Sequence, residues 1–107
     1  MPYPVNTLAQ FLEIQADCES GMDRADVAPR VLSANVWHAI ASFPGCLGDN
    51  HAVSRSREAA LDSVDYWLSD NDYSARYVRG QLRRNGICYL RDGRVITLSQ
   101  HAVSELF

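Results

Sequence analysis

Hydrophobic residues recur at the three- to four-residue spacing of an α-helix in four stretches of the chain. The first stretch starts at a capping-box sequence, Thr7-Leu8-Ala9-Gln10, and stops before Gly21, which predicts a helix over about 7–19. The second starts at Pro29, a residue favoured in the first turn of a helix, and ends at Pro44-Gly45, which predicts a helix over about 29–43. Its apolar stripe is formed by Leu32, Val36, Ala39, Ile40 and Phe43.

Two further helices are predicted in the second half of the chain. The third covers about 57–68, follows the capping residues Ser54 and Ser56, and has an acidic outer side. The fourth covers about 74–84 and stops at Asn85-Gly86. Residues 44–56 are rich in Gly, Asn, Asp and Ser, so they are predicted to form the longest loop.

Two short β-rich runs, Ile87–Leu90 and Val95–Leu98, flank the sequence Arg91-Asp92-Gly93-Arg94. Asp-Gly between such runs predicts a β-hairpin with a type I′ turn, which needs positive φ at both central residues. Ser99 would then cap a last short helix. The pattern therefore predicts a small α+β single domain over residues 1–107, helix-dominated, with one C-terminal β-hairpin packed against the helix before it.

Length and composition narrow the class of protein. With 107 residues, 47% of them hydrophobic, the chain can bury a core and is not disordered by composition. No apolar run approaches the roughly 20 residues that span a bilayer, and the start Met1-Pro2-Tyr3-Pro4 lacks the pattern of a signal peptide. Three widely spaced cysteines do not suggest a disulfide scaffold. We therefore expect a cytoplasmic protein without a membrane partner.

Charge is distributed unevenly along the chain. Residues 1–75 hold four arginines against eleven carboxylates, a formal charge of −7, whereas residues 76–107 hold six arginines against two carboxylates, a formal charge of +4. There is no lysine, and the planar guanidinium of arginine suits bidentate contacts with phosphate or carboxylate. Either the basic end binds an anionic partner, or it folds back on the acidic part and neutralises it.

The fourth predicted helix and the hairpin tip concentrate the basic residues. At 100° per residue, Arg76, Arg79 and Arg83 lie on one stripe of the helix, whereas Tyr77 and Gln81 lie on another side. A row of arginines next to a basic loop suits a phosphate backbone, with bases or sugars contacted from the neighbouring side. The candidate nucleic-acid contacts are Arg76, Arg79, Gln81, Arg83, Arg84, Arg91 and Arg94.

The run Tyr77-Val78-Arg79-Gly80-Gln81-Leu82-Arg83-Arg84-Asn85-Gly86-Ile87, followed by Arg91-Asp92-Gly93-Arg94-Val95-Ile96-Thr97-Leu98-Ser99, resembles the recognition helix and wing of winged helix-turn-helix DNA-binding domains. The resemblance covers about a third of the chain. It implies that the candidate residues of the helix face DNA and that Arg91 and Arg94 form the wing. The leading hypothesis is thus a non-enzymatic nucleic-acid-binding protein of winged-helix type, a small transcriptional regulator that can form a homodimer, because a lone domain of this size contacts few base pairs.

The acidic part of the chain supports a second hypothesis. Carboxylates concentrate in residues 13–26 and 58–72. A protein-binding module, or an inhibitor encoded by a phage or mobile element, could use them to dock on the basic groove of a host nucleic-acid-handling complex.

An enzyme built on a cysteine nucleophile is a third hypothesis. Cys46 with His51, or Cys88 with His101, would supply the nucleophile and base, but no motif surrounds either pair. Cys46 and the histidines His38 and His51 match no established zinc-ligand spacing. We therefore expect no catalytic residue, no metal and no cofactor.

Overall fold

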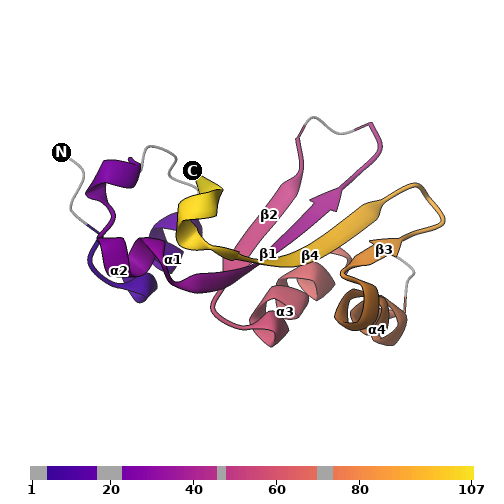
Figure 1. Ribbon diagram of the computed structural model, residues 1–107. Coiled ribbons are helices and arrows are strands. Elements are labelled where there is room, and N and C mark those ends of the chain that lie inside the picture. Colours follow the sequence, from indigo (N-terminus) through magenta and orange to yellow (C-terminus); the bar gives the residue numbers. More distant parts are fainter. Residues whose placement is uncertain (1–4, 17–22, 46–47, 70–73) are drawn as a thin grey trace.

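The computed structural model describes residues 5–16, 23–45, 48–69 and 74–107. Its strands are β1 (Asn35–Ser42), β2 (Asn50–Ser54), β3 (Ile87–Tyr89) and β4 (Val95–Ala102). They form one antiparallel sheet with the order β2-β1-β4-β3 (Figure 1). β1 and β4 pair along their whole length, from Asn35 opposite Ala102 to Ser42 opposite Val95. The two hairpins of the sheet therefore meet through their long inner strands.

The helices are α1 (Leu8–Ala16), α2 (Pro29–Leu32), α3 (Arg57–Trp67) and α4 (Ala75–Asn85), with 3₁₀ turns η1 (Arg24–Asp26) and η2 (Val103–Leu106). α3 lies against β1 and β2, and α4 lies against β3 and β4, so these two helices cover one face of the sheet (Figure 1). α1, α2 and η2 gather at the end of the sheet where β1 begins and β4 ends (Figure 1). None of the helices in the described ranges is long and apolar enough to cross a membrane.

Alternation along the strands divides the hydrophobic side chains between two cores. On the face towards α3 and α4, Ala39 and Ala41 of β1 pack with Ile96 and Leu98 of β4. The two helices and the residue after α3 contribute Ala60, Leu61, Val64, Leu68, Val78 and Leu82. On the opposite face, a second core lies at the end of the sheet where β1 begins, and Val36 is the residue of β1 that packs into it. The other buried residues of this core are Val5, Phe11, Val27, Val31 and Val103.

The predicted helix-dominated fold with a single C-terminal hairpin is wrong, because a four-stranded sheet forms the centre of the molecule. The helix expected over 29–43 ends at Leu32, and Asn35–Ser42 is a strand. The expected loop over 44–56 contains β2. β1 is flanked by strands on both sides and carries apolar residues on both faces, so its spacing fits a helix and a buried strand alike. The hairpin β3–β4 is one half of this sheet and not a separate wing.

The predictions for the other helices agree with the structure. α3 and α4 lie within one residue of the expected ranges, and each begins at a serine whose Oγ accepts an N–H bond, Ser56 from Ala59 and Ser74 from Tyr77. α4 ends at Gly86, whose φ of 72° is the left-handed conformation expected of a helix stop. The first predicted helix starts as expected, and its predicted last residues, 17–19, lie outside the described ranges.

The turn of the β3–β4 hairpin differs from the expected type I′ turn. The amide of Leu90 donates to the carbonyl of Arg94 at 2.8 Å, and the amide of Gly93 donates to the carbonyl of Leu90 at 3.1 Å. Gly93 has a φ of 91°, as in a three-residue loop that ends with a left-handed glycine. β4 also continues past the predicted end, so Ser99 is a strand residue and the expected last helix is the short turn η2.

Candidate functional site

The predicted row of arginines on α4 is divided by its contacts with α3. Glu58, Asp62 and Asp65 lie at helical spacing on α3, on the side that meets α4. The guanidinium of Arg79 contacts Glu58 Oε2 at 2.9 Å and Asp62 Oδ1 at 3.0 Å, and it also contacts Asp65 Oδ2. Arg83 binds both oxygens of Glu58, at 2.6 and 3.2 Å. These two arginines join the helices instead of forming a free basic row.

The ion pairs change the protonation of the groups that form them. Hydrogen bonds from Arg83 and then Arg79 lower the pKa of Glu58 below its ordinary value. The hydrogen bond with Asp62 raises the pKa of Arg79 above its ordinary value, with further contributions from Asp65 and Glu58, whereas desolvation opposes this shift. Of the two alternatives for the basic C-terminal residues, Arg79 and Arg83 follow the second: they pair with carboxylates of α3 and neutralise them.

Arg94 is also engaged, in the turn of the hairpin. Its guanidinium pairs with the carboxylate of Asp92 and lies 5.7 Å from the ring centroid of Phe43, and its side chain is only 11% exposed. Asp92 Oδ1 also accepts the backbone N–H of Arg94 at 3.1 Å. The side-chain bond from Arg94 is the main cause that lowers the pKa of Asp92. Arg94 therefore holds the turn and does not project from it.

The remaining predicted residues project from other sides of α4 and from the turn. Within the described ranges, Arg76, Arg84 and Arg91 have no carboxylate partner, and all three are exposed. The Gln81 side chain accepts a bond from Asn85 Nδ2 at 2.8 Å. The structure thus brings Arg79 and Arg83 together in one cluster, whereas no described carboxylate engages Arg76, Arg84 or Arg91.

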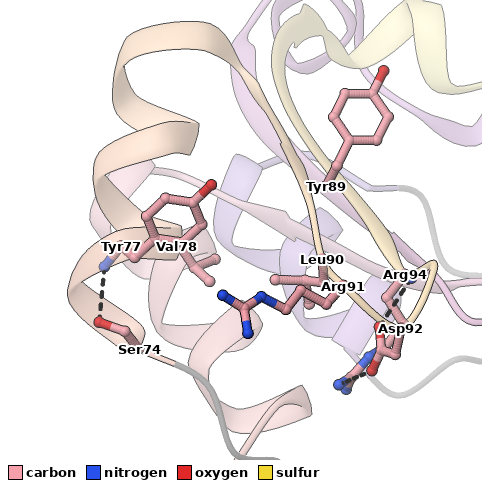
Figure 2. Close-up of a pocket in the computed structure, with 8 residues that line it drawn as sticks. All are labelled: Ser74, Tyr77, Val78, Tyr89, Leu90, Arg91, Asp92 and Arg94. Carbon is pink, nitrogen blue, oxygen red and sulfur yellow. Dashed lines mark hydrogen bonds and ion pairs between the residues drawn. The ribbon is translucent and has the colours of Figure 1, made fainter.

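Arg91 extends into a pocket between α4 and the turn of the β3–β4 hairpin (Figure 2). The pocket has a volume of about 580 Å³ and is open to solvent. Its lining residues are Ser74, Tyr77, Val78, Tyr89, Leu90, Arg91, Asp92 and Arg94. The Arg91 side chain runs from the turn towards the first turn of α4, whereas Asp92 and Arg94 pair with each other on the far side of the turn (Figure 2). We call Arg91 with Tyr77 and Tyr89 the pocket triplet.

The two tyrosines of the pocket triplet present large ring surfaces to solvent. Tyr77 is 52% exposed and Tyr89 is 68% exposed, so both rings are accessible to a ligand, as is Tyr66, which is 79% exposed on α3. Tyr77 was recognised from the sequence as a neighbour of the arginines, but Tyr89 was not. The alternation of β3, in which Cys88 is buried between two less buried residues, is the signal that places Tyr89 on the outside.

The chain's three histidines form a second cluster, on the sheet face opposite α3 and α4. His38 Nε2 lies 3.0 Å from His51 Nδ1, and the ring centroids of His38 and His101 are 6.3 Å apart. Burial, followed by the charges of His51 and His101, lowers the pKa of His38. In the part of the chain that the structure describes, no three His, Cys, Asp or Glu side chains are grouped to hold a metal ion.

The two Cys-His pairs considered from the sequence have different outcomes. Cys46 lies outside the described residues, so its pairing with His51 is not described. Cys88 is buried in the core under the helices, where burial raises the pKa of its thiol, whereas His101 belongs to the cluster on the opposite face. The sheet itself separates Cys88 from His101, so the structure does not bring this second pair together.

We compared the chain with protein-family models, curated proteins and solved structures, and none of them matches it. Functional inference therefore depends on the geometry and chemistry of its own residues.

Proposed function

We propose that this protein binds a single-stranded segment of nucleic acid at the pocket triplet. The observation that carries the proposal is the Arg91 guanidinium, which has no carboxylate partner among the described residues and extends towards the exposed Tyr77 in an open pocket that Tyr89 also lines (Figure 2). Single-strand binding typically combines a cation for the phosphate with aromatic rings on which bases stack.

The size and shape of the pocket favour an unpaired nucleotide as its occupant. A volume of about 580 Å³ lies within the range of small-molecule sites and can hold a base that leaves the strand. Val78 and Leu90 supply apolar contacts and Tyr77 supplies aromatic surface near Arg91, whereas the ring of Tyr89 extends away from Arg91 at the rim (Figure 2). A duplex keeps its bases stacked inside, so it would meet the pocket only with its phosphates.

Charges around the pocket support an anionic strand. Arg76 lies next to Tyr77 in the first turn of α4, and Arg84 lies two turns further on the side of Tyr77. The amino-terminal end of α4 also carries a partial positive charge from its backbone N–H groups. With Arg91, these groups give one side of α4 a positive potential that the α3–α4 ion pairs do not cancel.

The same ion pairs weaken the second hypothesis for the acidic residues of α3, whereas Asp70 and Asp72 lie outside the described residues. Glu58, Asp62 and Asp65 already bind Arg79, and Glu58 also binds Arg83, so docking on a basic groove would have to compete with these contacts. We therefore favour the nucleic acid over a basic protein as the partner.

Fluorescence anisotropy with a labelled 15-nucleotide oligothymidine at low salt tests the proposal. We expect Arg91→Ala to raise the dissociation constant by about tenfold, which corresponds to the loss of roughly 1.4 kcal/mol. Tyr89→Ala is expected to weaken binding by a comparable factor, because stacking of one base on an aromatic ring contributes about 1–3 kcal/mol. Arg24→Ala is the matched control, since it removes the same charge from an exposed position in η1.

Three results would overturn the proposal. The first is no binding of the oligonucleotide by the wild-type protein at low salt. The second is an equal effect of Arg24→Ala and Arg91→Ala, which would mean that only the overall charge matters. The third is tighter binding of a duplex of the same length than of the single strand.

A further inference from the structure

Ser99, His101 and Glu105 form a continuous hydrogen-bonded chain on the sheet face opposite α3 and α4. Ser99 Oγ lies 2.7 Å from His101 Nε2, and His101 Nδ1 lies 2.8 Å from Glu105 Oε2. A carboxylate can only accept, so the imidazole donates through Nδ1–H to Glu105. In the neutral ring Nε2 then has a free lone pair, and the hydroxyl of Ser99 donates to it.

The fold produces this chain from local geometry. Ser99 and His101 are two positions apart in β4, so their side chains lie next to each other on the same face. The strand ends at Ala102, and η2 turns the backbone so that Glu105 reaches the other nitrogen of His101. A hydroxyl, a base that takes its proton and a carboxylate that orients the base are the three parts of an activated serine nucleophile.

We propose that Ser99 is a reactive nucleophile that accepts an acyl group from a carboxylic ester, with His101 as the general base and Glu105 as a positioning residue. This activity is independent of nucleic-acid binding at the pocket triplet. It pairs His101 with Ser99 and not with Cys88, which lies on the other face of the sheet. Ser99 and His101 touch the reacting atoms, whereas Glu105 acts through His101.

The chemical step is an ordinary acyl transfer. Ser99 Oγ attacks the ester carbonyl carbon, and its proton moves to His101 Nε2. The C–O bond to the leaving group breaks, and the leaving alkoxide takes the proton from His101. Water then attacks the acyl-serine with His101 again as the base, which releases the carboxylic acid and restores Ser99.

The surroundings of Ser99 indicate an apolar acyl group. Thr97 is the neighbour of Ser99 on the same face of β4, on the side of the hairpin turn. In the register of the sheet, it lies between Ile40 of β1 and Ile87 of β3. Val95 continues this strip, and the three apolar side chains are only partly buried. An acyl chain extending from Ser99 along β4 would cover them, which favours a butyryl ester over an acetyl ester.

The nucleophile can be tested on the intact protein with a fluorophosphonate probe and with p-nitrophenyl esters. Intact-mass and peptide mass spectrometry should find one adduct per chain, on Ser99. Ser99→Ala should abolish it, and His101→Gln should slow labelling at least tenfold. Ser42→Ala is the matched control, because Ser42 lies on the same sheet face at the end of β1 and has no histidine opposite it in the register. p-Nitrophenyl butyrate should acylate the protein faster than the acetate.

The role of Glu105 needs a readout that separates orientation from folding. In the wild-type protein, proton NMR should show a strongly downfield Nδ1–H resonance from His101, and Glu105→Gln should remove it while the melting temperature stays within a few degrees. Labelling of Ser99 should slow in the same variant. Absence of an adduct on the wild-type protein, an adduct on another residue, or labelling of His101→Gln at the wild-type rate each overturns the proposal.

Discussion

Replacing Arg79 by methionine keeps most of the length of the side chain but removes the charge that joins α4 to α3. The Arg79 side chain is 21% exposed and contacts Glu58, Asp62 and Asp65. Partly exposed ion pairs contribute about 0.2–1 kcal/mol each, and removing the cation also leaves three carboxylates facing each other. We therefore expect Arg79→Met to lower the free energy of unfolding by about 2 kcal/mol, within the range of these pair contributions.

The assay is thermal and urea unfolding followed by circular dichroism. For a chain of this size, a loss of about 2 kcal/mol lowers the melting temperature by roughly 10 °C. The difference between wild type and variant should shrink in 1 M salt, where the Debye length is about 3 Å. Arg84→Met is the matched control on the same helix, because Arg84 is exposed and has no carboxylate partner within the described ranges.

The same network predicts a dependence on pH. The folded protein holds the pKa of Glu58 below its ordinary value, so the stabilisation is present above that ordinary value and is lost as the pH falls through the folded value. Arg79→Met should flatten the acid limb of the stability curve below about pH 4.5. The structural role of Arg79 is refuted if Arg79→Met melts like the wild type. Loss of oligonucleotide binding by Arg79→Met, with binding retained by Arg91→Ala, would mean that Arg79 and not Arg91 contacts the nucleic acid.

Three other substitutions test features of the fold and its buried groups. Gly86→Ala should destabilise the protein by roughly 1–2 kcal/mol in urea unfolding, because the φ of Gly86 is 72° and the added Cβ would lie 3.1 Å from the carbonyl oxygen of Leu98. Gly80→Ala, within α4, should instead stabilise the protein by up to about 1 kcal/mol. Equal effects of the two substitutions would contradict the special role of Gly86. Cys88 should resist alkylation until the protein unfolds, measured in a variant whose other two cysteines are serine, because its thiol is buried and its pKa is raised; rapid alkylation of the folded protein would disprove the burial. The lowered pKa of His38 means that the unfolded chain binds a proton more tightly than the folded protein, so the free energy of unfolding should fall as the pH drops below about 6.5. Urea titrations at about pH 5 and pH 7 should show a smaller difference in the free energy of unfolding for His38→Gln than for the wild type. An unchanged difference would argue against the shift.

Local signals in the sequence were sufficient for α3, α4 and the existence of the β3–β4 hairpin. Ser56 and Ser74 cap helices where expected, and Gly86 ends the second of them. These signals act through hydrogen bonds between residues close in the chain, so no knowledge of the tertiary structure is needed to interpret them. The hairpin was predictable for the same reason. Its turn type was not, because Gly93, with a φ of 91°, ends a three-residue loop and not a two-residue one.

The prediction for residues 29–56 was wrong because the structure of this segment is decided by long-range pairing. Trp37, Ala39 and Ala41 face the helices, whereas Val36 enters the second core, so β1 has no simple alternation of polar and apolar residues. Alanine also has a high helix propensity, and only pairing with β4 overrides it.

The candidate sites show the same division between local and long-range information. The arginines of α4 were identifiable from helical spacing, but which of them pair with α3 depends on how the two helices pack. The contact between His38 and His101 depends on the β1–β4 register, in which His38 lies opposite Ser99. The Ser99–His101–Glu105 chain is local, yet it required β4 to continue beyond Leu98, where a helix cap was expected.

The pairing of β1 with β4 also bears on how the chain acquires its structure during synthesis. Every pair in this ladder joins residues more than fifty positions apart, so β1 leaves the ribosome long before its partner strand exists. A two-stranded hairpin is at best marginally stable in water, and an unpaired apolar strand is prone to join other chains. Rapid folding is therefore not expected of this protein, and the interval before β4 is made is the time at which its nascent chain has most need of a chaperone.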